Sequence, residues 1–98
     1  MKITIKDLES KIDRLNTITN NPLKSYLQNE QGQYESQVGN YCLAGAYGGY
    51  ELHQIVNTGG GITTPLNTGY TSKKALWYAI DNYMSGIKTE RESEVHNV

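Results

Sequence analysis

The chain has 98 residues, a formal net charge of −1 and 37% hydrophobic residues, which fits one domain with a modest core rather than two domains. Because the charge is near neutral, no strong field steers the whole molecule to nucleic acid or to a membrane, and the single cysteine, Cys42, excludes an intrachain disulfide. The N-terminus lacks the apolar core of a signal peptide and no apolar run reaches the ~18 residues of a membrane helix, so we expect a cytoplasmic protein.

The first predicted element is a helix from Thr4 to about Ile18. Apolar residues recur at helical spacing along one face of it, namely Ile5, Leu8, Ile12 and Leu15. Thr4 is a favourable N-cap residue, and Asp7 occupies the N3 position of a capping box. The helix should end at Asn20-Asn21-Pro22, because the residue before a proline avoids the helical region.

A tight β-hairpin is predicted over residues 41–56. Before it, residues 23–37 show little periodicity, with an exposed turn at 29–33 and a short strand from Tyr34 to Val38. We place the hairpin turn at Gly48-Gly49, because a Gly-Gly pair can take positive φ at both central positions of a type I′ turn. In this register Tyr47 faces Tyr50, and His53 faces Ala44.

The predicted hairpin has one clearly apolar face, which we expect to meet the helices. That face carries Tyr41, Leu43, Tyr47, Tyr50, Leu52 and Val56. The other face carries Cys42, Ala44, Ala46, Glu51, His53 and Ile55. The small residues of 44–46 leave room for a ring or another backbone to approach.

A second turn and a second helix complete the predicted elements. Thr58–Gly61 is a glycine-rich turn, and Ile62–Thr64 reads as a third strand that Pro65 confines to an edge. The helix should run from Ser72 to about Ser85, with Gly86 as its C′ residue. Its apolar stripe is formed by Leu76, Ile80, Tyr83 and Ile87, with Trp77 and Met84 beside it.

This order of elements predicts an α+β fold. A small antiparallel sheet of two or three strands is covered on one face by the N-terminal and C-terminal amphipathic helices. Residues 1–87 form the single domain. Residues 88–98 are polar, have no periodic apolar face and are predicted to be a disordered tail.

Three segments have distinctive residues: Leu15-Asn16-Thr17-Ile18-Thr19-Asn20-Asn21-Pro22, then residues 38–52 with Asn40-Tyr41 and Ala46-Tyr47-Gly48-Gly49-Tyr50-Glu51-Leu52, then Thr58-Gly59-Gly60-Gly61. In these segments, across most of residues 1–87, the chain resembles a family of small bacteriophage and prophage proteins of unknown function. The resemblance brings no catalytic residues. It implies expression from a mobile element inside a bacterial host cell, in host takeover, defence evasion or accessory work.

The sequence offers no convincing catalytic or metal site. Cys42 and His53 share the less apolar face, but the predicted register does not pair them, so a buried cysteine near a surface histidine is the better interpretation. Adding Glu51 gives three metal ligands and leaves zinc without a fourth. We therefore expect a protein that is not an enzyme, with no catalytic residue, metal or cofactor.

Two features of the sequence could bind an anion, the glycine-rich turn and the Tyr-rich sheet. The amides of Gly59-Gly60-Gly61 could form an anion-binding nest, but no Lys-Ser/Thr follows as in a P-loop, so a glycine-rich turn is favoured and anion binding stays open. A Tyr-rich sheet resembles base-stacking platforms. However, no Lys or Arg occurs between Lys24 and Lys73, and phosphate contacts supply most of the affinity for nucleic acid, which makes nucleic acid an unfavoured partner.

What remains is an aromatic surface built from eight Tyr and one Trp, with no Phe. Tyr and Trp dominate binding hot spots, so we predict a binding protein whose partner is a host or defence protein, inhibition being the concrete form of its action. The residues predicted to bind the partner are Tyr47, Tyr50, Tyr70, Trp77 and Tyr78. The alternatives are a small-ligand or nucleotide binder and a single-stranded nucleic-acid-binding module. We also expect a homodimer, because a small Tyr-rich core leaves aromatic surface to cover.

Overall fold

The computed structural model describes residues 2–96 and confirms the α+β fold with N-terminal and C-terminal helices. Helix α1 (Ile5–Ile18) is followed by five short strands and then by helix α2 (Lys73–His96). The strands are β1 (Tyr26–Gln28), β2 (Tyr34–Ser36), β3 (Tyr41–Ala46), β4 (Gly49–Ile55) and β5 (Ile62–Thr63). No helix among the described residues is long and apolar enough to span a membrane.

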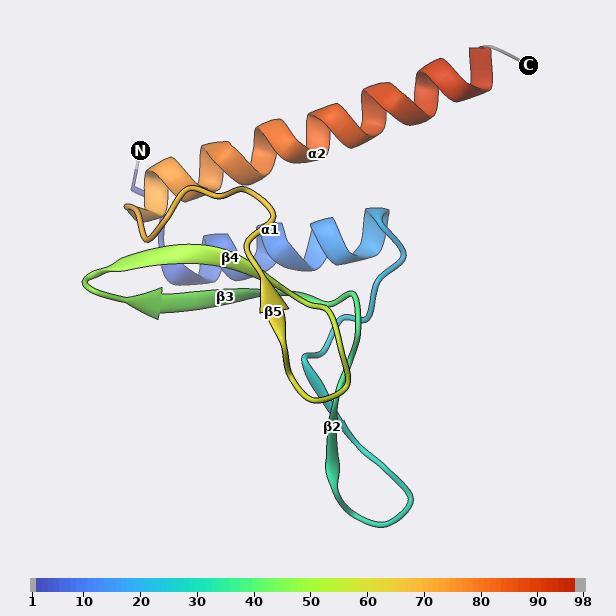
Figure 1. The fold of residues 1–98 in the computed structure, drawn as a ribbon. Helices are drawn as coiled ribbons and strands as arrows, with labels where there is room; N and C mark the ends of the chain where they lie inside the picture. The colour runs from blue at the N-terminus through green and yellow to red at the C-terminus, as the bar shows by residue number, and fades with distance from the viewer. Residues whose placement is uncertain (1, 97–98) are drawn as a thin grey trace.

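The strands form two separate antiparallel sheets (Figure 1). Strands β3, β4 and β5 make a three-stranded sheet in that order, with β4 in the centre. Strands β1 and β2 form a two-stranded arm that projects away from the helices. The arm is closed by the predicted turn at 29–33, where Asn29 accepts the backbone N–H groups of Gln31 and Gln33 on its side-chain oxygen.

Helix α1 starts with the predicted capping box. The Thr4 N–H donates to the Asp7 carboxylate at 2.8 Å, and the Asp7 N–H donates to the Thr4 hydroxyl at 3.1 Å. Hydrogen bonding to Thr4, chiefly from its backbone N–H, lowers the pKa of the Asp7 carboxyl. Leu8, Ile12 and Leu15 are buried as expected, but Ile5 is 43% exposed, so it does not belong to the buried stripe.

The core lies between the two helices and one face of the three-stranded sheet. Its buried side chains are Ile3, Leu8, Ile12, Leu15, Tyr41, Leu52, Leu76, Ile80 and Met84. Helix α2 begins after Ser72, whose hydroxyl accepts the Ala75 N–H at 3.1 Å. The two helices are joined by an ion pair between Lys11 and Asp81.

Helix α2 does not end at Gly86, and the predicted C-terminus near Ser85 was wrong. It continues to His96, ten residues beyond Gly86. A C′ glycine ends a helix when it takes positive φ, and Gly86 is not among the glycines that do. Glycine inside a helix costs only about 1 kcal/mol, so the backbone can continue through it. Residues 88–96, which were predicted to be a disordered tail, are therefore helical in the structure as the last part of α2, and residues 97–98 lie outside the described residues.

The hairpin is present, but its turn lies one residue earlier than predicted. Ala46 pairs with Gly49, so the two-residue turn is Tyr47-Gly48 and not Gly48-Gly49. The backbone φ is +52° at Tyr47 and +73° at Gly48, the positive pair that a type I′ turn needs. As a result Tyr50 pairs with Gly45 rather than Tyr47, and His53 pairs with Cys42 rather than Ala44.

The reason for this shift is the space that Gly49 leaves. A Cβ atom at Gly49 would lie 2.9 Å from the Tyr70 carbonyl carbon and 3.0 Å from the Thr71 nitrogen. Gly49 is therefore required for close approach of another backbone, not for the turn. The observed register shifts each cross-strand partner by two residues from the predicted one. Because side chains alternate with a period of two, each residue of the strands stays on its predicted face of the hairpin. Tyr41 and Leu52 are buried in the core, whereas Tyr47 leaves the apolar face by lying in the turn, and Val56 is exposed.

Candidate functional site

The tip of the β3–β4 hairpin carries an aromatic cluster. Tyr47 projects from the turn and is 96% exposed. Its ring meets the Tyr70 ring edge-on, with centroids 5.7 Å apart, and the Tyr70 ring lies 6.2 Å from the His53 ring. We call Tyr47, Tyr70 and His53 the tip cluster.

Tyr70 reaches the tip cluster through a backbone contact that the sequence did not reveal. The connection between β5 and α2 passes along β4, where the Tyr50 N–H donates to the Thr71 carbonyl at 2.8 Å and the Thr71 N–H donates to the Tyr50 carbonyl at 2.9 Å. This bridge is the contact that needs Gly49 to lack a side chain. Gly49 and Tyr50 of the hairpin thus position Tyr70, which lies at least twenty residues further along the sequence.

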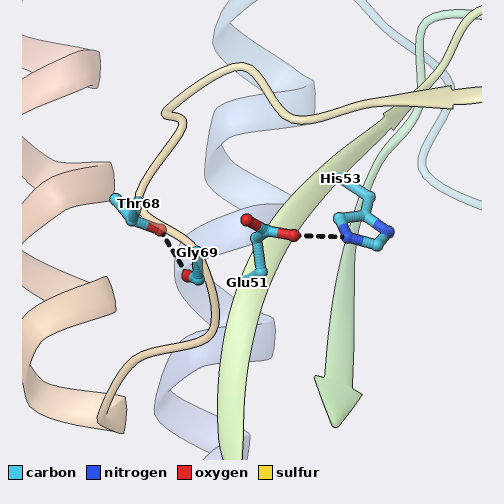
Figure 2. A network of polar contacts seen from close by, with 4 residues as sticks. All are labelled: Glu51, His53, Thr68 and Gly69. Atoms are coloured by element: carbon cyan, nitrogen blue, oxygen red, sulfur yellow. Dashed lines mark hydrogen bonds and ion pairs between the residues drawn. The ribbon is translucent and has the colours of Figure 1, made fainter.

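Beneath the tip cluster lies a buried acid. Glu51 is only 8% exposed, although it faces away from the helices, and its carboxylate is 2.9 Å from Nε2 of His53. Figure 2 shows Glu51 between His53 and the loop at Thr68 and Gly69, where the Thr68 hydroxyl donates to the Gly69 carbonyl. The carboxylate fixes the orientation of the imidazole, which in turn lies against Tyr70.

Cys42 is the cross-strand neighbour of His53, which corrects the predicted register. This pairing does not make Cys42 an activated nucleophile. Burial raises the pKa of the Cys42 thiol, and a hydrogen bond with Ser25 opposes that rise only in part. A catalytic cysteine requires the opposite shift, toward the thiolate. Among the side chains that the structure describes, no three His, Cys, Asp or Glu are grouped so that they could hold a metal ion.

The glycine-rich turn is closed by Asn57. The Gly61 N–H donates to the Asn57 side-chain oxygen at 2.9 Å, and the Gly60 N–H donates to the Asn57 carbonyl at 3.1 Å. Two of the three amides that could form an anion nest are therefore already satisfied within the turn. This arrangement favours the predicted structural role.

Two of the predicted binding residues form a second aromatic pair on helix α2. The Trp77 and Tyr78 rings meet edge-on, with centroids 5.3 Å apart. Trp77 is half-buried against the core and carries the Lys11 ammonium 4.0 Å from its ring centroid, while Tyr78 is exposed. Among the described residues, no ring contact joins this pair to the tip cluster.

The predicted binding residues therefore fall into three different settings. Tyr47 and Tyr70 lie together in the tip cluster, and Trp77 and Tyr78 lie together on α2. Tyr50 belongs to neither, because it is half-buried against the core, with its ring near Gly45. Sequence reasoning missed His53 and Glu51 as parts of the aromatic surface, since only the true register and the Tyr70 contact bring them there.

The β1–β2 arm carries exposed aromatic residues that sequence reasoning also missed. Tyr34 is 73% exposed, and Tyr26, on the paired strand, is exposed as well. The register sets Tyr26 opposite Ser36 and Tyr34 opposite Gln28, so the two rings lie on the same face of the arm. The weak periodicity of residues 23–37 gave no signal for this.

Comparisons of this chain with protein-family models, with curated proteins and with solved structures found no match. The resemblance to phage and prophage proteins thus stays a prediction from the sequence.

Proposed function

We propose that the protein is a non-enzymatic binding protein that contacts a partner protein through the tip cluster. The observation that supports this most is the backbone of Tyr47. Among the described residues, Tyr47, Asn20 and Asn67 are the non-glycine residues with positive φ. Asparagine is common in that region, whereas a bulky aromatic residue there is strained.

Tyr47 makes few contacts in the folded protein that could offset this backbone strain. Its side chain is almost fully exposed, and its ring contact is the edge-on one with Tyr70. Residues held in strained conformations concentrate at functional surfaces. A tyrosine ring offers a large contact area at a small cost in rotamer entropy, which is why it is frequent in binding surfaces. Partner binding therefore explains Tyr47 better than stability does.

The charge around the tip cluster supports a protein partner over nucleic acid. The Glu51 carboxylate lies 2.9 Å from His53 of the cluster, and the sequence between Lys24 and Lys73 contains no Lys or Arg. Rings without neighbouring cations cannot neutralise phosphates. The proposal includes the setting that the resemblance implies, an accessory factor of a bacteriophage or prophage that acts on a host or defence protein in the bacterial cytoplasm.

A pull-down from bacterial lysate with matched variants tests this function. We expect a protein captured by the wild type to be lost with the double variant Tyr47→Asn and Tyr70→Ala. Tyr34→Ala serves as the control, because Tyr34 is another exposed tyrosine on a different surface. Binding that survives the double variant in a folded protein, or turnover of a substrate by the purified protein, would contradict the proposal.

A small anionic ligand is a second candidate, favoured by one groove. The groove, of about 290 Å³, lies between α1 with the residues before it and the start of α2, and it is lined by Lys2, Ile3, Asp7, Ser10, Lys11, Arg14 and Trp77. Lys11 is already paired with Asp81, so Lys2 and Arg14 are the cations left to meet an anion. Thermal-shift measurements with nucleotides test it: a shift that disappears in Arg14→Gln supports this candidate, and no shift with any nucleotide contradicts it.

A further inference from the structure

The outer edge of strand β3 offers unpaired backbone groups. β3 is an edge strand of the three-stranded sheet, and alternate residues of such a strand turn their N–H and C=O groups away from the neighbouring strand. The backbone of Tyr41 is bonded to the side chain of Asn16 and not to β4. The outward-facing residues are therefore Tyr41, Leu43 and Gly45, and beyond Tyr41 the edge is open at Leu43 and Gly45.

One end of this edge is closed by asparagine side chains. Asn16 donates to the Tyr41 carbonyl at 3.0 Å and accepts the Tyr41 N–H at 2.8 Å, so it satisfies both groups as a neighbouring strand would. Asn40 donates to the Pro22 carbonyl and accepts the Ser25 hydroxyl, which fixes residues 22–25 at the same end. Beyond this plug, no hydrogen bond among the described residues closes the outer edge of β3 at Leu43 or Gly45, although edge strands are usually guarded.

A groove lies between α1 and the first half of β3, from Asn40 to Leu43, so it reaches the open part of the edge at Leu43. It has a volume of about 250 Å³, and Ile12, Leu23 and Leu43 supply its apolar wall. Glu9 and Asp13 lie on the helix side of the groove, and both are exposed. Neither carboxylate forms an ion pair with another described residue.

The spacing of the two carboxylates matches an extended chain. Glu9 and Asp13 are four residues apart on α1, which corresponds to about 6 Å along the helix axis. Alternate residues of a β-strand, whose side chains share one face, are about 6.6 Å apart. Helix α1 and strand β3 run side by side in opposite directions (Figure 1), so a strand added to β3 would lie along this row of acids.

We propose that the β3 edge accepts an extended segment of a partner protein as an added strand, with Lys or Arg at alternate positions facing Glu9 and Asp13. Backbone hydrogen bonds to Leu43 and Gly45 would supply the pairing, and the two carboxylates would select the basic side chains. A second copy of this chain fits less well, because pairing two β3 edges about a twofold axis sets the acidic flank of one α1 against that of the other. This surface differs from the tip cluster, so either can fail without the other.

The probe is a synthetic ten-residue peptide in which lysine alternates with valine and threonine, titrated against the full chain by fluorescence anisotropy. The matched variants are Gly45→Pro and Gly45→Ala. Proline removes the outward N–H and blocks the edge without removing a bond to β4. Alanine keeps the N–H, and its Cβ meets no atom closer than 3.6 Å. We expect Gly45→Pro to weaken binding at least about tenfold and Gly45→Ala to leave it within about twofold.

A second experiment changes the peptide and leaves the protein unchanged, so it tests the inference even if the Gly45→Pro variant does not fold. Two methylated peptides are compared, each carrying N-methyl groups on every second residue. Methylation of the residues whose N–H groups face β3 should abolish binding, whereas methylation of the residues between them should not, because their N–H groups face away. The charge requirement is tested with Glu9→Gln combined with Asp13→Asn. We expect this variant to bind the peptide roughly fivefold more weakly at low salt and to lose most of the salt dependence.

Several results would overturn the inference. Absence of peptide binding would do so, as would equally tight binding of a peptide with glutamate in place of lysine. An equal loss of binding by the two methylated peptides would also overturn it. If sedimentation shows a dimer that Gly45→Pro dissociates while the peptide does not bind, a second copy is the occupant and the proposed partner is wrong. The pull-down with tip-cluster variants reports on the proposed function separately.

Discussion

The side-chain amide of Asn16 pairs with both backbone groups of Tyr41, donating to the carbonyl at 3.0 Å and accepting the N–H at 2.8 Å. Asn16 is 1% exposed and lies on the core side of α1, where a helix of this pattern would normally carry an apolar residue. One polar side chain thus anchors helix α1 to the first residue of β3.

We predict that Asn16→Leu destabilises the protein by about 2–3 kcal/mol. Leucine would suit the helix, but it leaves a buried N–H and a buried C=O without partners, and each such loss costs about 1–3 kcal/mol. Urea unfolding followed by circular dichroism measures the change. Ser10→Ala, on the exposed part of the same helix, is the control and should stay within about 0.5 kcal/mol of the wild type. A fully stable Asn16→Leu variant would show that the pairing is dispensable.

The two turn glycines should respond differently to alanine. Gly49→Ala places a Cβ against the backbone of Tyr70 and Thr71, so we expect it to be the more damaging change, by more than about 2 kcal/mol. Gly48→Ala meets no neighbour and carries only the strain of positive φ, about 1 kcal/mol. Thermal unfolding of the two variants checks the order. The reverse order would place the turn at Gly48-Gly49 after all.

Replacing Tyr47 should separate stability from binding. Tyr47→Asn creates Asn-Gly, the preferred pair of a type I′ turn, so we expect the free energy of unfolding to be unchanged or raised by up to about 1 kcal/mol. The same variant should bind the partner more weakly. A drop in stability of more than about 1 kcal/mol would instead show that the contact with Tyr70 is structural and would remove the main support for the proposed function.

The Cys42 thiol should be slow to alkylate. Because burial raises its pKa in the folded protein, the thiolate fraction at a given pH is lower than in the unfolded chain, and the reaction should rise only at higher pH. Iodoacetamide rates measured from pH 7 to 10, in native buffer and in urea, test this. Ser25→Ala should slow the native reaction further, since the contact with Ser25 opposes the rise in the pKa of the thiol. A native rate above the unfolded rate would reopen the question of a reactive Cys42–His53 pair.

Removing residues 90–98 should leave the domain intact. The core side chains described for α2 end at Ile87, and the predicted tail has no periodic apolar face. We expect the melting temperature to change by less than about 2 °C in differential scanning calorimetry. A fall of several degrees would show that the last turns of α2 stabilise the fold.

Much of the fold was predictable because it depends on local signals. The capping box at Thr4 and Asp7 and the apolar spacing of Leu8, Ile12 and Leu15 define α1 through contacts within one helix. The same holds for the Ser72 cap and the buried stripe of Leu76 and Ile80 in α2. The two faces of the hairpin were also recoverable, because alternation survives a register shift of two residues.

Which residues come together on the candidate surfaces was harder to predict from the sequence. Tyr47 and Tyr70 were both recognised as binding residues, but nothing local indicates that they meet, or that Glu51 and His53 lie beside them. The arm formed by β1 and β2 was missed for a related reason. Its strands have only three residues each, too few for an alternating pattern to emerge.

Local sequence patterns were enough to predict the two helices, the hairpin and its apolar face, because each depends on residues within a few positions of one another. Which glycine serves the turn depends instead on a tertiary contact, since the backbone at Tyr70 and Thr71 must pass beside Gly49. Tertiary contacts also set Asn16 against one end of the β3 edge and place Glu9 and Asp13 in the groove between α1 and β3. These features join elements distant in the chain, and their energies come from packing and hydrogen bonds that no local pattern records.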